Sequence, residues 1–101
     1  MAYKNYPPKF KHESAALVLD QGYTIQEACD AVGVGQTAIR RWVTQLQEER
    51  AGNTPQKAKA LTAEHQEIQA LKEEVKRLKR EKEILKKASA LLMSETFNGS
   101  N

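Results

Sequence analysis

Apolar side chains recur at helical spacing through the first half of the chain. Between residues 9 and 50 they repeat every three or four positions, which is the spacing of one face of an α-helix. Two breaks interrupt this pattern. The pattern therefore predicts three short helices, at residues 9–21, 25–32 and 36–50.

The breaks carry residues that commonly end or begin helices. Gly22 is suited to end the first helix, because glycine readily adopts the left-handed conformation. Thr24 is a good N-cap for the second helix, with Glu27 three residues later as in a capping box. Gly33 lies in a link too short for anything but a tight turn, where a residue with a Cβ would be strained. The second and third helices are therefore expected to be joined by that tight turn.

The residues around the turn match the demands of a helix-turn-helix. Such a motif needs small residues where its two helices approach and apolar residues that lock the last helix onto the others. Ala28 and Cys29 supply the small positions, Val34 fills the turn, and Ile39 and Trp42 pack inward. We therefore expect an all-α, three-helix, DNA-binding domain. A three-helix bundle that binds protein or nothing is the alternative.

The outer face of the third helix favours DNA over this alternative. Its candidate DNA-contacting residues are Gln36, Thr37, Arg40, Arg41 and Thr44. None of them is acidic, and Arg and Gln can read guanine and adenine through two hydrogen bonds each. Because the N-terminal end of a recognition helix enters the groove, we expect Gln36 and Thr37 to face bases. The two arginines reach either bases or phosphates.

A heptad repeat of leucines follows in the second half of the chain. With these leucines at position d, β-branched residues occupy the first two a positions, which favours a parallel two-stranded coiled coil. The predicted oligomerisation residues are Ile68, Leu71, Val75, Leu78, Lys82, Leu85 and Leu92. Positions g and e agree with this assignment, because across a parallel dimer they form three pairs of opposite charge: Glu67–Lys72, Glu74–Lys79 and Glu81–Lys86. We expect a dimer or a higher oligomer.

Two features leave the oligomer number open. Lys82 is a polar residue at position a, which costs stability and helps to specify the oligomeric state. Ile84 and Leu91 fall at position c, outside the seam. They are either harmless there or part of a second apolar stripe for another partner.

These patterns divide the chain into five segments. The residues between the two helical regions include Gly52, Asn53 and Pro55, which are poor in helices, and Thr62 is a credible N-cap for the long helix. The predicted segments are a flexible arm at 1–8, a helix-turn-helix domain at 9–50, a linker at 51–61, a leucine-zipper helix at 62–93 and a disordered tail at 94–101.

Composition narrows the function further. The net charge is +3, but residues 1–50 hold six basic and six acidic side chains, so DNA binding must rest on local placement of charge. The single cysteine, Cys29, fits a reducing cytoplasm, and no apolar run approaches the roughly 20 residues of a membrane span. His12 and His65 lack companion ligands, so neither a metal nor another cofactor is expected.

Three stretches of the chain resemble one protein family. They are Phe10-Lys11-His12-Glu13-Ser14, Val32-Gly33-Val34 with Arg41-Trp42-Val43, and the zipper segment from Arg77 to Ala88. Together they resemble the short first-frame protein, often called OrfA, of bacterial insertion sequences that encode a two-frame DDE transposase. Lys82 departs from the pattern, because asparagine is common at that position in the family.

The resemblance implies a function in DNA transposition. The helix-turn-helix would bind the terminal inverted repeats of the element. The zipper would support homo-oligomers and hetero-oligomers with a longer fusion product that carries the catalytic DDE domain. The short chain would then be a non-catalytic, cytoplasmic bacterial subunit that modulates transposition.

Two other functions stay open on the sequence. One is a stand-alone dimeric helix-turn-helix transcriptional repressor, which would use the same residues. The other is an interaction protein that uses only the coiled coil. An enzyme is not expected, because DDE chemistry needs three carboxylates that hold two metal ions on a mixed sheet fold, and the chain has no strand-like runs.

Overall fold

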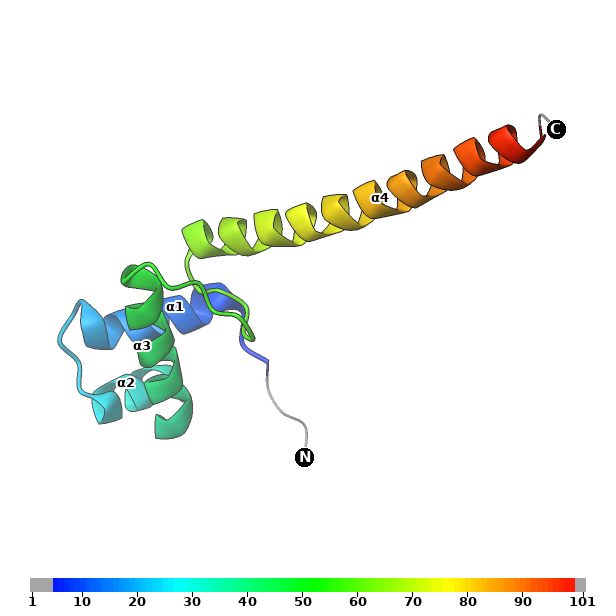
Figure 1. Cartoon of the computed structure of the whole chain (residues 1–101). Coiled ribbons are helices and arrows are strands. Elements are labelled where there is room, and N and C mark those ends of the chain that lie inside the picture. The colour runs from blue at the N-terminus through cyan, green and yellow to red at the C-terminus, as the bar shows by residue number, and fades with distance from the viewer. Residues whose placement is uncertain (1–4, 100–101) are drawn as a thin grey trace. The chain divides into compact units, whose positions relative to one another are not determined.

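Four α-helices make up the regular secondary structure of the part of the chain that the structure describes. The computed structural model describes the backbone of residues 5–99 and the side chains of residues 5–94. The helices are α1 (Pro8–Leu19), α2 (Ile25–Val32), α3 (Gln36–Arg50) and α4 (Ala63–Gly99) (Figure 1). The all-α fold with a helix-turn-helix domain and a long C-terminal helix is thus confirmed.

The helix boundaries agree with the sequence pattern for α2 and α3 and differ for the other two helices. The first helix begins at Pro8, where the fixed φ of proline suits the first helical position, and ends at Leu19 rather than Gln21. The last helix runs to Gly99, past the predicted end at Met93. Residues 1–4 of the predicted arm and residues 100–101 of the predicted tail lie outside the described residues.

Local signals explain where α2 begins and ends. The Thr24 hydroxyl accepts a hydrogen bond from the Glu27 amide at 3.1 Å, and the Glu27 carboxylate accepts one from the Thr24 amide at 3.0 Å. Gly33 adopts the left-handed conformation, with φ of 71°, and its amide donates to the Cys29 carbonyl at 2.8 Å. Both were predicted from the sequence, because capping boxes and glycine caps involve residues only three or four apart.

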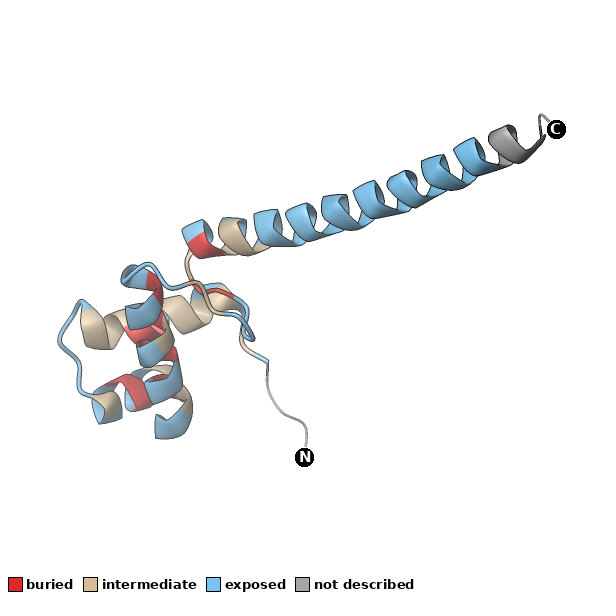
Figure 2. Ribbon diagram, viewed as in Figure 1, coloured by how far each residue is buried: buried red, intermediate tan, exposed pale blue. Residues whose placement is uncertain are grey.

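The three short helices enclose one core, and Figure 2 colours the buried residues of the chain red. The buried apolar side chains of this core are Ala15, Ala28, Cys29, Ile39, Trp42, Val43, Leu46 and Leu61. Trp42 is surrounded by aromatic rings, since Phe10 and Tyr6 meet it edge-on with centroids 5.9 and 5.4 Å away. Tyr6 lies in the predicted flexible arm, yet its ring also stacks on Phe10 at 5.0 Å. The arm therefore contributes to the core from Tyr6 onward.

A buried carboxylate at the end of α3 binds the segment that follows it. Glu49 is only 2% exposed. Its carboxylate oxygens accept hydrogen bonds from the Leu61 amide at 2.9 and 3.1 Å, from the Thr62 amide at 2.9 Å and from the Thr62 hydroxyl at 2.8 Å. Gln45, one turn earlier on α3, donates to the same carboxylate at 2.9 Å. We refer to Glu49 and its three partners as the Glu49 clasp.

Further hydrogen bonds order residues 51–61, the segment predicted as a linker. The Gln69 side-chain amide donates to the carbonyls of Pro55 and Ala58, each at 2.9 Å, and accepts from the Ala60 amide at 2.9 Å. The buried His65 ring shares a 2.7 Å hydrogen bond with the Thr54 hydroxyl. The chain divides into two compact units, and the first of these extends to Gln69. This segment and the first turns of α4 therefore belong to the same unit as α1, α2 and α3.

The Glu49 clasp leads to a stability prediction. Replacing Glu49 with alanine leaves the amides of Leu61 and Thr62 without their acceptor, which should lower the free energy of unfolding by about 1–3 kcal/mol. Glu48→Ala is the matched control, because Glu48 is exposed and its carboxylate accepts a hydrogen bond from the exposed side chain of Asn53. We expect the control to stay within about 0.5 kcal/mol of the parent chain in urea denaturation at fixed protein concentration. Equal losses in both variants would contradict the role given to Glu49.

The same carboxylate predicts a pH dependence of stability. Burial raises the pKa of Glu49, but the hydrogen bonds from Leu61, Gln45 and Thr62 outweigh it, so the pKa lies below its ordinary value of 4.5. The unfolded chain therefore takes up this proton more readily than the folded chain, and stability falls as the pH drops below about 4.5. Glu49→Gln removes this contribution and leaves those of Asp20 and Glu27, whose pKa values are also lowered. Denaturation at a series of pH values should give a shallower acid loss for Glu49→Gln, and parallel curves would refute the prediction.

Candidate nucleic-acid interface

The outer face of α3, which the sequence predicts to contact DNA, is exposed. All five residues predicted to contact DNA, Gln36, Thr37, Arg40, Arg41 and Thr44, are exposed, while Ile39, Trp42, Val43 and Leu46 of the same helix are buried. The core residues hold one side of α3 and leave the polar side open. The structure thus brings the five predicted residues onto one face of one helix. Their contact with DNA stays a prediction.

The arginines at the two ends of α3 differ in the charge of the side chain that they bind. At the C-terminal end, the Arg50 guanidinium binds both carboxylate oxygens of Asp20, at 2.7 and 2.8 Å. The hydrogen bond from Arg50 lowers the pKa of Asp20 below its ordinary value. At the N-terminal end, the Arg40 guanidinium donates to the neutral side-chain amide of Gln36 at 3.4 Å. The charge of Arg50 is therefore matched within the fold, whereas the hydrogen bond of Arg40 leaves its charge unmatched.

Gln26 of α2 joins this face, although the sequence pattern did not predict it. The side-chain amide of Gln36 donates to the side-chain oxygen of Gln26, and the amide of Gln26 donates to Asp30 at 2.9 Å. The spacing of four residues from Gln26 to Asp30 is a helical signal that the sequence contains. The contact from Gln26 to Gln36 crosses the turn, so no periodic pattern indicates it.

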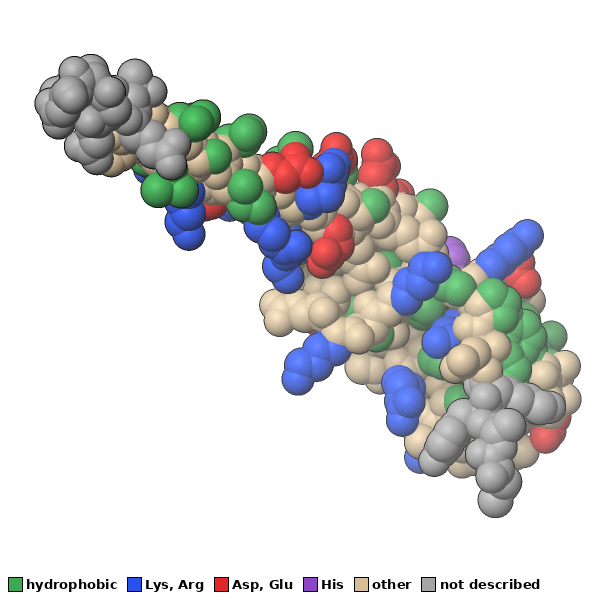
Figure 3. Space-filling model, turned by 90° about the vertical axis from the view of Figure 1, so that its right-hand side faces the viewer, with side chains coloured by type: hydrophobic (Ala, Val, Ile, Leu, Met, Phe, Trp, Pro, Cys, Tyr) green, Lys and Arg blue, Asp and Glu red, His purple; other side chains and the backbone are tan. Residues whose placement is uncertain are grey.

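On the face that Figure 3 shows, basic side chains lie at several separate places and do not gather in one patch. This agrees with the even balance of charge in residues 1–50. Lys11 lies with its amino group 6.0 Å from the centre of the Trp42 ring, close enough for a cation–π interaction. DNA contact by this unit would therefore depend on a few placed side chains and not on a strong general field.

The predicted oligomerisation residues lie along α4. Ile68, in the first unit, is half-buried, and the six others lie in the second unit and are exposed. The apolar ones are exposed to a large extent, from 49% for Val75 to 67% for Leu85. Ile84 and Leu91 are also exposed, at 60% and 67%. In the described chain, the apolar stripe of α4 is therefore uncovered, and its pairing with another chain stays a prediction.

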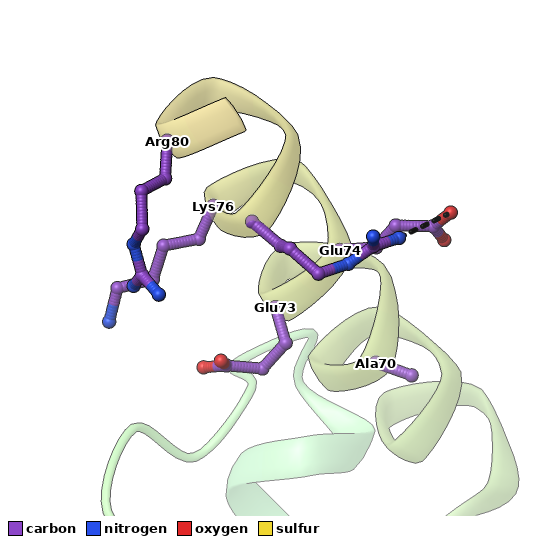
Figure 4. Close-up of a pocket in the computed structure, with 6 residues that line it drawn as sticks. Ala70, Glu73, Glu74, Lys76 and Arg80 are labelled. Carbon is purple, nitrogen blue, oxygen red and sulfur yellow. Dashed lines mark ion pairs between the residues drawn. The ribbon is translucent and has the colours of Figure 1, made fainter. Parts of the chain in front are cut away.

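Charged side chains flank this stripe and interact within the helix. Arg77 lies 3.0 Å from Glu81 and 3.9 Å from Glu74, two of the three glutamates predicted to pair with lysines of a partner chain. Six residues of α4 line a shallow hollow, and Figure 4 labels five of them, Ala70, Glu73, Glu74, Lys76 and Arg80; the sixth is Arg77. All six come from one helix face, so the hollow lacks the opposing wall that encloses a small ligand.

Neither a metal site nor a membrane-spanning helix is found in the residues that the structure describes. In this part of the chain, no three His, Cys, Asp or Glu side chains are grouped so that they could hold a metal ion. None of its helices combines the length and the apolar character needed to cross a membrane.

Known proteins resemble this chain over most of its length. The family model described as "Transposase", of the helix-turn-helix type, matches residues 1–82. The InsN proteins of the insertion sequence elements IS911A and IS911B of Escherichia coli (strain K12), which are named as transposases, are each 47% identical over 73 residues. These residues are 72% of this chain, 54% of the IS911A protein and 82% of the IS911B protein, so the chain spans about half the length of the first. No solved structure matches it. The chain belongs to the helix-turn-helix transposase family.

Proposed function

We propose that this chain is the DNA-recognising, oligomerising subunit of an insertion-sequence transposase. It binds the terminal inverted repeats of its element through α3 and assembles through α4. The observation that carries the proposal is the exposed polar face of α3, held outward by a buried apolar face in a chain of the transposase family.

The chemistry of α3 supports sequence-specific binding. An amide at Gln36 and guanidiniums at Arg40 and Arg41 offer the donor and acceptor patterns that distinguish adenine and guanine in the major groove. Thr37 and Thr44 add hydroxyls suited to bases or phosphates. Except for Thr44, which lies just past the middle of α3, these groups lie on its N-terminal half, the end that enters the groove in helix-turn-helix proteins.

The apolar stripe of α4 supports assembly. A long helix with exposed leucines at every seventh position gains stability by covering them with another helix. Glu residues at g and Lys residues at e favour a parallel partner with the same sequence. A dimer carries two helix-turn-helix domains, and it binds a DNA with two sites more tightly than a monomer does, because the second contact becomes intramolecular.

The catalytic part of the system belongs to a different chain in this proposal. A longer fusion product that shares this N-terminal sequence would carry the DDE domain and join the short chain through the same zipper. The short chain, without that domain, would regulate transposition by forming mixed oligomers and by occupying the repeats.

A transcriptional repressor would use the same contacts, so the bound sequence separates the two functions. Selection of binding sites from a random duplex pool gives a consensus for the purified chain. A consensus that matches inverted repeats at both ends of an element supports the transposase subunit. A consensus found only at a promoter favours the repressor.

The proposed function leads to a prediction for the DNA-binding face of α3. The double substitution Arg40→Ala and Arg41→Ala should weaken binding to the selected duplex by about tenfold or more, since each bidentate contact contributes about 1–3 kcal/mol of discrimination. Lys57→Ala and Lys59→Ala together are the control, because both lysines are exposed and the charge removed is the same. Fluorescence anisotropy at one fixed salt concentration measures both. If the two double variants lose affinity equally, α3 does not read the sequence.

The proposed function also leads to a prediction for the oligomerisation stripe of α4. Leu78→Asp puts a charge at a d position and should convert the oligomer to a monomer in analytical ultracentrifugation. Ile84→Asp is the control, because Ile84 is also exposed but lies at position c. We expect this variant to remain oligomeric. A monomeric Ile84→Asp beside an oligomeric Leu78→Asp would assign the interface to the other stripe.

A further inference from the structure

Four exposed side chains form a chain of hydrogen bonds from α2 to the N-terminal half of α3. Gln26 donates to Asp30 at 2.9 Å and accepts from the side-chain amide of Gln36. The oxygen of Gln36 accepts in turn from the Arg40 guanidinium at 3.4 Å. Two of these four residues, Gln36 and Arg40, are among those proposed to contact DNA. The other two belong to α2.

This series of hydrogen bonds determines which way the amide of Gln36 points. A glutamine amide has one oxygen that accepts and one nitrogen that donates, and exchanging them loses every hydrogen bond made by both. At Gln36, Gln26 requires the donor on one side and Arg40 requires the acceptor on the other. The reverse orientation would place donor against donor at Arg40 and acceptor against acceptor at Gln26. The two neighbours together therefore select one orientation.

The selected orientation leaves Gln36 able to bind a base. The amide nitrogen has a second hydrogen and the oxygen has a second lone pair beyond those used by Gln26 and Arg40. One donor and one acceptor are what a bidentate contact to adenine in the major groove requires. The side chain is thus ordered before DNA arrives, so less conformational entropy is lost on binding.

We propose that Gln26 is a positioning residue for DNA recognition, which holds the Gln36 amide in the orientation that reads adenine. The inference rests on the proposed function of α3 as the recognition helix. Gln26 acts through Gln36 and is not itself required to contact a base. The DNA that fits this arrangement carries an A·T pair at the position that Gln36 faces.

The anchor of the arrangement is Asp30. Its carboxylate accepts from the Gln26 nitrogen, which turns the Gln26 oxygen toward Gln36. Asp30 and Gln26 lie one turn apart on α2, so the helix itself sets their spacing. Asp30 thus orients Gln26, and Gln26 in turn orients the Gln36 amide on α3.

The test uses the full chain and a consensus duplex that it selects from a random pool. Gln36→Ala first identifies the base pair at which preference is lost. Gln26→Met keeps the length of the side chain without its acceptor, and should relax the preference at the same pair by about threefold to tenfold, less than Gln36→Ala does. Gln26→Glu can no longer donate to Asp30, but both oxygens of its carboxylate accept, so an acceptor for Gln36 is present in either orientation. The base preference should therefore return, while the negative charge weakens binding to all duplexes alike.

Two controls separate positioning from general damage. Gln47→Met changes an exposed glutamine near the other end of α3 and should leave the base preference unchanged. Thermal denaturation should give the same midpoint for all variants, because Gln26 and Gln36 are exposed. The double variant Gln26→Met with Gln36→Ala should discriminate no worse than Gln36→Ala alone, since Gln26 acts only through Gln36.

Three results would overturn the inference. Additive losses in the double variant would mean that Gln26 acts independently of Gln36. A uniform loss of affinity in Gln26→Met, with a weaker salt dependence, would mean that Gln26 contacts the phosphate backbone. If the parent chain selects no consensus at all, the proposed function fails and the inference fails with it, which distinguishes that case from the first two.

Discussion

The buried carboxylate of Glu49 is the interaction on which the organisation of the first unit depends. A charge at 2% exposure is costly unless hydrogen bonds replace its water, and four donor groups do so here: the amides of Leu61 and Thr62, the Thr62 hydroxyl and the Gln45 side chain. Three of these four lie beyond the end of α3, so the chain must return to that end to satisfy the charge. This return buries Leu61 in the core and places Thr62 where its hydroxyl accepts from the His65 amide in the first turn of α4.

The core and the clasp together hold α3 from one side. Ile39, Trp42 and Leu46 anchor its inner face, Glu49 anchors its C-terminal end, and Arg50 ties that end to Asp20. The outer face is left to polar side chains that touch the solvent and, at Gln36, a neighbour on α2. As the proposed recognition surface, this face depends on rigidity more than on charge, in keeping with a unit whose first 50 residues carry no net charge.

The second unit follows a different physical rule. The side chains of its helix are exposed throughout the described residues, so its apolar stripe would become buried only by packing against another helix. Two of the three glutamates that flank the stripe already have a cation within reach, because Arg77 lies between Glu74 and Glu81 on the same helix. Pairing with a partner's lysines would therefore replace contacts within the helix, and such exposed pairs would influence orientation more than affinity.

The sequence by itself determined the features whose causes lie within a few residues of one another. The capping box of Thr24, the left-handed Gly33, the inward and outward faces of α3 and the heptads of α4 follow from spacings of three, four and seven. Only the tertiary structure decided the burial of Glu49, the place of Tyr6 beside Trp42 and the contact between Gln26 and Gln36. The partners in these contacts are separated by a turn, a helix or an irregular segment, and no periodicity links them. A glutamate near the end of a helix looks like a surface residue until the chain beyond it returns with donors, and that return depends on how the whole unit packs.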